Sequence, residues 1–350
     1  EITGEKTRRR IPSPTSGMGV CPTPRTVLHE VEEFLMDNPQ QPPIALSARD
    51  LQKTYKAGGN QPAKEALKGI DLDIPRGAIF GLLGPNGAGK STFINILAGL
   101  VIKSGGSANI WGFDIDSNPR QARASIGIVP QELSIDPFFT PAEIMELQAG
   151  LYGVPRKQRR TNEILSAMGL ADKAQAYART LSGGMRRRLL VAKAMVHNPP
   201  VLVLDEPTAG VDIELRRQLW NYVIELNRQG VTIMLTTHYL EEAEELCDTV
   251  AIIDNGAVVA CDKTDNLLRQ IDNKTLIIRP NSRLESAPII ADLQCALRDD
   301  GQLIIQYNPG QHAAGEVLAL VQKNGIEIAD LASEGADLET VFMKLTRSSI

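Results

Sequence analysis

Residues 84–92 read GPNGAGKST, and an apolar run stands directly before them. The glycines and the Lys-Ser pair have the spacing of a phosphate-binding loop, and the apolar residues that follow recur at helical spacing. The loop positions are Gly84, Pro85, Asn86, Gly87, Ala88, Gly89, Lys90, Ser91 and Thr92. In such a loop, successive backbone N–H groups and a helix N-terminus surround an anion. The order of strand, loop and helix therefore predicts an α/β fold with a nucleotide-phosphate site.

Two side chains of this loop have predicted roles. Lys90 is expected to reach the β- and γ-phosphates, and the Ser91 hydroxyl is expected to coordinate magnesium. A glycine turn with an incidental lysine is the alternative interpretation. The bare pattern arises by chance in roughly one chain in a hundred of this length, so a second motif is needed.

That second motif is VLVLDEP, in which the run 201–204 ends in Asp205 and Glu206. A continuous apolar run is typical of a parallel strand covered on both faces. Open α/β sheets bind ligands at the carboxyl ends of such strands. Asp205 is predicted to hold magnesium through water, and Glu206 to orient and deprotonate the attacking water. Two solvated acids at a strand end are the alternative, which a preceding phosphate loop disfavours.

Three further motifs carry a family resemblance. LSGGM (181–185), DEPTAGVD (205–212) and TTH (236–238) resemble the signature, the Walker B motif with its D-loop, and the H-loop of ATP-binding cassette ATPases. The resemblance extends over residues 44–262. It implies an α/β P-loop NTPase core with an antiparallel β edge, a helical subdomain at about 133–180, and ATP with Mg²⁺ as the bound species.

The resemblance also implies roles for single residues. Gln131 resembles the Q-loop glutamine, which senses magnesium and links the site to a transport partner. His238 resembles the switch histidine that contacts the γ-phosphate. Tyr55 resembles the aromatic residue that stacks on adenine, with an ordinary strand-end tyrosine as the alternative. Asp212, in the D-loop, is predicted to lie at the nucleotide.

The signature predicts a second anion site. Ser182, Gly183 and Gly184 precede a run at helical spacing, so a serine cap and two bare amides are expected to open a helix. In the family, this segment, with Leu181 before it, faces the γ-phosphate held by another subunit. The resemblance thus implies a head-to-tail homodimer with each ATP between two chains. A plain Ser-Gly-Gly turn would be favoured if the other motifs were absent.

Composition excludes some classes of protein. With 350 residues and 43% apolar composition, the chain can bury one large domain and a small one. No uninterrupted apolar stretch is long enough to cross a membrane. The net charge of −5 gives no basic footprint for nucleic acid, so no nucleic-acid partner is expected. Four cysteines without metal spacing fit a reducing cytoplasm.

The chain divides into three predicted parts. Residues 1–43, with three arginines and many prolines, predict a disordered extension. Residues 44–264 are predicted to form the nucleotide-binding domain. Residues 265–350, with short alternating apolar pieces, predict a small C-terminal α/β accessory domain.

Details of the motifs resemble one branch of the family, the YadG-type ATPases of bacterial ABC-2 exporters. Met185, the segment THYLEEAEELCD and the closing DLETVFMKLT carry this resemblance. It implies a cytoplasmic subunit, peripheral on the inner face of the membrane, that powers a separate ABC-2 permease for export. Three arginines, 186–188, follow the signature, and both a solvated helix face and a role near the membrane partner remain open for them.

The alternative is a soluble, non-transport cassette ATPase acting on ribosomes or DNA. Ribosome-acting members generally carry two cassettes, and this chain has one phosphate loop. DNA-repair members insert a long coiled coil, for which the stretch between Lys90 and Leu181 is too short. A catalytically dead module would lack Glu206 or His238, and both are present.

Overall fold

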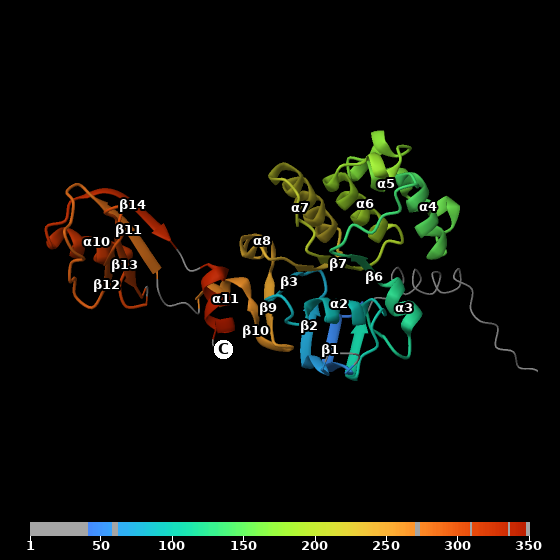
Figure 1. Cartoon of the computed structure of the whole chain (residues 1–350), viewed down its shortest axis with the longest axis horizontal. Helices are drawn as coiled ribbons and strands as arrows, with labels where there is room; N and C mark the ends of the chain where they lie inside the picture. Colours follow the sequence, from blue (N-terminus) through green and yellow to red (C-terminus); the bar gives the residue numbers. More distant parts are fainter. Residues whose placement is uncertain (1–40, 58–61, 270–273, 309, 335–336, 348–350) are drawn as a thin grey trace, which may run out of the picture.

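Figure 1 shows a computed structural model of the chain, which describes residues 41–57, 62–269, 274–308, 310–334 and 337–347. The extension predicted over residues 1–43 lies outside the described residues, apart from its last three positions.

A six-stranded sheet forms the centre of the molecule, in the order β10-β9-β3-β8-β7-β6. The strands are β3 (Ile79–Leu83), β6 (Ile126–Val129), β7 (Val201–Asp205), β8 (Thr232–Thr236), β9 (Thr249–Asp254) and β10 (Ala257–Lys263). They pair in parallel except for β10, which is antiparallel to β9. Every residue of β3 and all but the last of β7 are buried, because layers cover both faces of the sheet. The two parallel strands predicted from their apolar runs are confirmed.

A second, antiparallel sheet forms the predicted β edge, in the order β2-β1-β4-β5. Its strands are β1 (Ile44–Tyr55), β2 (Lys64–Pro75), β4 (Gly105–Ile110) and β5 (Phe113–Asp114), with α3 (Pro119–Ala124) following. Helix α2 (Lys90–Leu97) shares one apolar core with both sheets, to which Leu46, Phe80 and Phe93 contribute. The phosphate loop therefore connects two elements of this core, β3 and α2, while Asn86 and Gly87 of the loop are exposed.

Helices cover the other side of the central sheet (Figure 1). They are α4 (Pro141–Leu151), α5 (Thr161–Ala167), α6 (Gly183–Met195), α7 (Ile213–Arg228) and α8 (Leu240–Leu246), with short 3-10 turns at Arg156–Gln158, Ala171–Lys173 and Ala178–Thr180. A capping box starts α4, because Glu143 N donates to Thr140 Oγ1 and Thr140 N donates to a carboxylate oxygen of Glu143. The helical spacing read over 133–180 thus corresponds to α4 and α5.

The C-terminal part has its own sheet, in the order β12-β13-β11-β14. Its elements are β11 (Lys274–Pro280), β12 (Gln294–Leu297), β13 (Leu303–Tyr307), α10 (Ala314–Lys323) and β14 (Ile328–Glu334). Apolar side chains of the sheet and of α10, among them Ile278, Ile305 and Val317, form a separate core. This sheet lies to one side of the cassette in Figure 1.

The last helix does not pack with that sheet. Helix α11 (Leu338–Arg347) contacts α8 and α9 (Thr264–Arg269) of the cassette. Figure 1 shows α11 beside the cassette and apart from the C-terminal sheet. Leu338 and Val341 are buried in the main core, and Leu338 N donates to Glu244 Oε2 at 3.1 Å. Within the residues 265–350, predicted to form a small α/β accessory domain, β11 to β14 and α10 thus share a core of their own, whereas α11 packs on α8 and α9.

The melting temperature of Leu338→Ala is expected to fall by several degrees. Removing a fully buried leucine costs about 2–5 kcal/mol, and Leu338 has no exposed surface. A thermal melt followed by circular dichroism measures the change. Ile289→Ala is the matched control, because Ile289 is 93% exposed and its removal should leave the melting temperature unchanged. Equal melting temperatures for both variants would contradict the docking of α11.

Candidate active site

Neighbouring backbone leaves no room for a side chain at two glycines of the phosphate loop, Gly84 and Gly89. A Cβ on Gly84 would lie 2.2 Å from the Ile253 carbonyl oxygen. A Cβ on Gly89, which has φ +117°, would lie 2.7 Å from the Ala66 carbonyl oxygen. Glycine is therefore required at both positions, by close approach and, at Gly89, also by the left-handed backbone.

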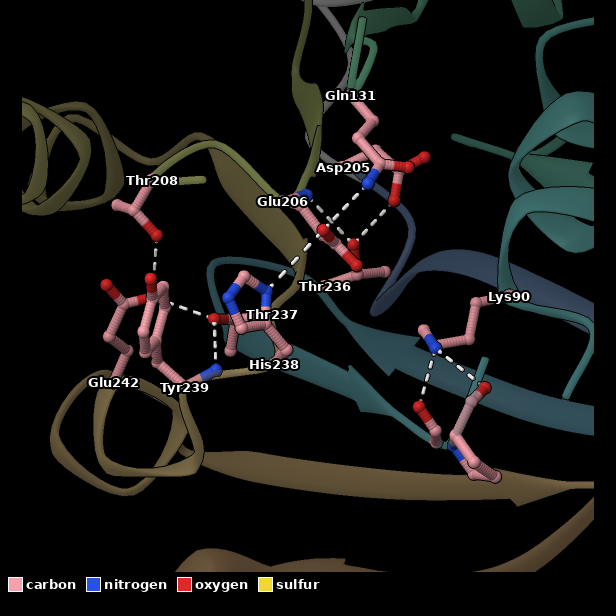
Figure 2. Close-up of polar contacts among 12 residues, drawn as sticks. Lys90, Gln131, Asp205, Glu206, Thr208, Thr236, Thr237, His238, Tyr239 and Glu242 are labelled. Carbon is pink, nitrogen blue, oxygen red and sulfur yellow. Dashed lines mark hydrogen bonds and ion pairs between the residues drawn. The ribbon is translucent and has the colours of Figure 1, made fainter. Parts of the chain in front are cut away.

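Lys90 is the cation of this loop. Its residue is only 9% exposed, and Nζ donates to the carbonyl oxygens of Gly84 at 2.6 Å and Pro85 at 3.1 Å, as Figure 2 shows. Burial lowers the pKa of Lys90, while the carboxylates of Glu206 and Asp205 raise it. Its ammonium is thus fixed at the loop, where it can form charge-assisted hydrogen bonds to a phosphate.

Asp205 ends β7 beside Thr236, the last residue of β8. Thr236 Oγ1 donates to Asp205 Oδ1 at 2.6 Å and accepts from Glu206 N at 3.0 Å. Burial raises the pKa of Asp205. A cation bound nearby would oppose that effect and favour the ionised carboxylate. The Ser91 hydroxyl is exposed at the start of α2, and the Gln131 amide supplies another oxygen. These hard oxygen donors are the ligands that Mg²⁺ takes, so the residues fit that ion.

Gln131 and His238 converge on Glu206 from two other segments (Figure 2). Gln131 Nε2 donates to Glu206 Oε2 at 2.8 Å, and His238 Nδ1 lies 3.5 Å from the same oxygen. The Glu206 backbone has φ +46°, a left-handed conformation that is costly for a residue other than glycine. Strained backbone of this kind collects at functional sites. The structure therefore joins three residues that are far apart in the sequence.

The remaining predicted residues lie at separate positions. Ser182 caps α6, with its Oγ accepting from Met185 N at 3.2 Å, as the serine cap predicted. Asp212 caps α7 by accepting from Leu215 N at 3.0 Å. Tyr55 is 40% exposed at the end of β1, with Lys53 Nζ 4.8 Å from its ring centre. Each of these contacts is to a residue nearby in the sequence, and none of them joins Ser182, Asp212 or Tyr55 to the phosphate loop.

The glycines of the signature differ in their surroundings. Gly183 is exposed, and a Cβ there would meet nothing within 4 Å. A Cβ on Gly184 would lie 2.4 Å from Leu215 Cδ1, so α6 and α7 approach each other closely at this point. Leu181 is buried just before them.

Sequence reasoning missed two buried charged residues near the site, Glu242 and Arg187. Glu242, buried on α8, accepts from Thr208 Oγ1 at 3.0 Å and from Thr237 Oγ1 at 2.8 Å. Arg187 of α6 is 3% exposed and donates to the carbonyl oxygen of Glu206 at 3.1 Å. A solvated face is therefore wrong for Arg187. The positions of Thr208 and Thr237 inside quoted motifs were the available signal, but nothing marked Glu242 or Arg187 as inward-facing.

Comparisons with known proteins agree with this geometry. Residues 67–209 match the family model described as "ABC transporter". The chain is 34% identical to the linearmycin resistance ATP-binding protein LnrL of Bacillus subtilis (strain 168), over 86% of this chain and 98% of that protein. The chain belongs to the ABC transporter ATP-binding family. It is also 35% identical to the daunorubicin/doxorubicin resistance ATP-binding protein DrrA of Streptomyces peucetius, over 87% of this chain and 93% of DrrA.

A solved ABC cassette supports the same assignment of the fold. The cassette MJ0796, solved as a dimer in a post-hydrolysis state with ADP and Pi, has a TM-score of 0.57 and 27% identity to this chain. The match covers 63% of this chain and 98% of the solved one. As an ABC ATPase, this chain binds and hydrolyses ATP. In the described part of the chain, no helix is long and apolar enough to cross a membrane.

Proposed function

We propose that this chain is the ATP-hydrolysing subunit of a bacterial ABC-2 type exporter, peripheral on the inner face of the membrane and working with a separate permease. The convergence of Gln131 and His238 on Glu206 carries the proposal, because it unites the residues that would link water activation to a transport partner. The chain is similar over 86–87% of its length to the resistance ATP-binding proteins LnrL and DrrA and to the Nod factor export ATP-binding protein I of Ralstonia nicotianae. This similarity favours export over a role on ribosomes or DNA.

In the proposed reaction, Glu206 takes a proton from the water that attacks the γ-phosphate, and His238 contacts that phosphate. Lys90 and the backbone N–H groups of the loop offset the phosphate charge. Bound Mg²⁺ would neutralise charge on the phosphates. Ser91, Asp205 and Gln131 are the residues that would hold it.

The proposed active unit is a head-to-tail homodimer. Ser182 and Gly183 are exposed at the N-terminus of α6, where unpaired amides and the helix dipole favour an anion. Together with Leu181, Gly184 and Asp212, they would face the ATP held by the phosphate loop of the second chain. In each chain, Tyr55 would stack on the adenine of the ATP held by the phosphate loop of the same chain.

Exposed apolar side chains offer the proposed permease a docking surface. They are Leu147 (55% exposed) and Leu151 (69%), four positions apart on α4, and Leu100 (77%), which lines one groove with Gln148 of α4. The groove has a volume of about 400 Å³, and its wall includes Pro130. Pro130 directly precedes Gln131, so a permease helix seated in this groove would shift the position of Gln131 and with it the contact of Gln131 with Glu206.

A combined Leu147→Asp and Leu151→Asp variant is expected to capture at least tenfold less of the permease. Two charges on an exposed apolar helix face would have to be desolvated on binding. The test is affinity purification of the tagged subunit, co-expressed with its permease, followed by quantification of that membrane protein. Ile289→Asp is the control, since it places a charge on an isoleucine of the C-terminal part. Equal permease capture by all variants, or capture of ribosomes or DNA instead, would contradict the proposal.

A further inference from the structure

A buried arginine connects the signature helix to the hydrolytic centre. Arg187 stands on α6, five positions after the cap Ser182, and is 3% exposed. Its Nη1 donates to the carbonyl oxygen of Pro130 at 2.8 Å, and its Nη2 donates to that of Glu206 at 3.1 Å. One guanidinium therefore joins the end of β6 to the end of β7.

These two bonds complete a ring of contacts through Arg187, Pro130, Gln131 and Glu206. Pro130 is bonded covalently to Gln131, and Gln131 Nε2 donates to Glu206 Oε2 at 2.8 Å. The side-chain contact between Gln131 and Glu206 is thus fixed at both of its backbone ends by Arg187. A planar guanidinium presents two donors in a rigid fork, which a flexible ammonium does not.

The same arginine supports the strained backbone of Glu206. A left-handed residue other than glycine persists only where its surroundings over-determine it. Here Glu206 N donates to Thr236 Oγ1 at 3.0 Å, and its carbonyl oxygen accepts from Arg187. Both peptide groups of Glu206 are therefore bound, and its carbonyl oxygen also accepts from Ala209 N at 3.2 Å.

Charge favours the arrangement as well. Burial lowers the pKa of Arg187, and the carboxylates of Asp205 and Glu206 oppose that effect. An arginine remains protonated in proteins, so Arg187 provides a permanent positive charge behind the two acids.

We propose that Arg187 is a positioning residue for hydrolysis, which holds Glu206 and Gln131 in the geometry for water activation. Because it stands on the signature helix, it also ties the base of one site to the orientation of the α6 N-terminus that faces the other site. This inference rests on the proposed function for the role of Glu206 and for the dimer.

The test replaces Arg187 by lysine and by methionine in the full chain. Lysine retains the charge, but all its donors sit on one nitrogen at the end of a flexible stem and do not form a rigid fork that spans the two carbonyl groups. Methionine retains apolar volume and has no donor. We expect kcat to fall about tenfold to a hundredfold, because small misplacements of reacting groups cost that much, and KM for ATP to stay within twofold. Arg188→Met is the matched control. Arg188 Nη1 donates to the carbonyl oxygen of Met168, at the C-terminal end of α5, at 2.6 Å. The kcat of this control variant should therefore change less than twofold.

A second measurement separates positioning from general damage. In a Glu206→Gln background the base is absent, so Arg187→Lys should cause no further loss of single-turnover rate. A kcat within twofold of wild type for the folded lysine variant, or an equal loss in both backgrounds, would overturn the proposal. Melting curves show whether each variant is folded. If the methionine variant is unfolded, the test rests on the lysine variant alone. Full activity of Glu206→Gln itself would instead refute the proposed role of the base.

Discussion

Lys90→Ala is expected to abolish ATP hydrolysis and to weaken ATP binding strongly. The ammonium is held at the phosphate loop by the carbonyl oxygens of Gly84 and Pro85, and its removal deletes the cation that would face the β- and γ-phosphates. Steady-state release of phosphate measures the first effect, and titration with a fluorescent ATP analogue measures the second.

The change is local to the site, so the variant should remain folded with a melting temperature close to that of wild type. Lys323→Ala, at the exposed C-terminal end of α10, is the control and should retain full turnover. Turnover of Lys90→Ala within twofold of wild type would refute the assignment of the phosphate loop.

Glu206→Gln is expected to reduce hydrolysis to a slow residual rate, measurable only in single turnovers, while ATP stays bound and holds two chains together. An amide cannot accept the proton of the attacking water, but it retains the size of the carboxylate and one of its two acceptor oxygens. The Gln131 contact at 2.8 Å can therefore persist through the remaining side-chain oxygen. Analytical ultracentrifugation with ATP and magnesium should show a dimer, and the same protein without nucleotide should sediment as a monomer.

Ser182→Arg in the same background tests whether the signature closes on the second chain. The exposed cap of α6 would then carry a bulky side chain, and the ATP-dependent dimer should disappear. A mixed dimer with Lys90→Ala in one chain and Ser182→Arg in the other should damage one shared site twice and leave the opposite site intact. A purely monomeric Glu206→Gln protein at micromolar concentration with ATP would count against the proposed dimer.

Local patterns alone predicted much of the fold. The apolar run ending in Asp205 became the parallel strand β7, because a strand covered on both faces must be apolar throughout. Helix α7 (Ile213–Arg228) also follows from local signals, since Asp212 caps it and its apolar residues recur at helical spacing. Glycines that admit a phosphate, and acids at a strand end, are likewise visible in short stretches of sequence.

Only the tertiary structure decided which distant side chains meet. Arg187 lies between two other arginines and resembles part of a solvated face, but it is buried because the ends of β6 and β7 present carbonyl oxygens to it. Helix α11 likewise has an apolar face whose partner, α8, lies far away in the sequence. Helical spacing specifies which side chains share a face, whereas the elements packed against that face determine whether a charge is buried and what it binds.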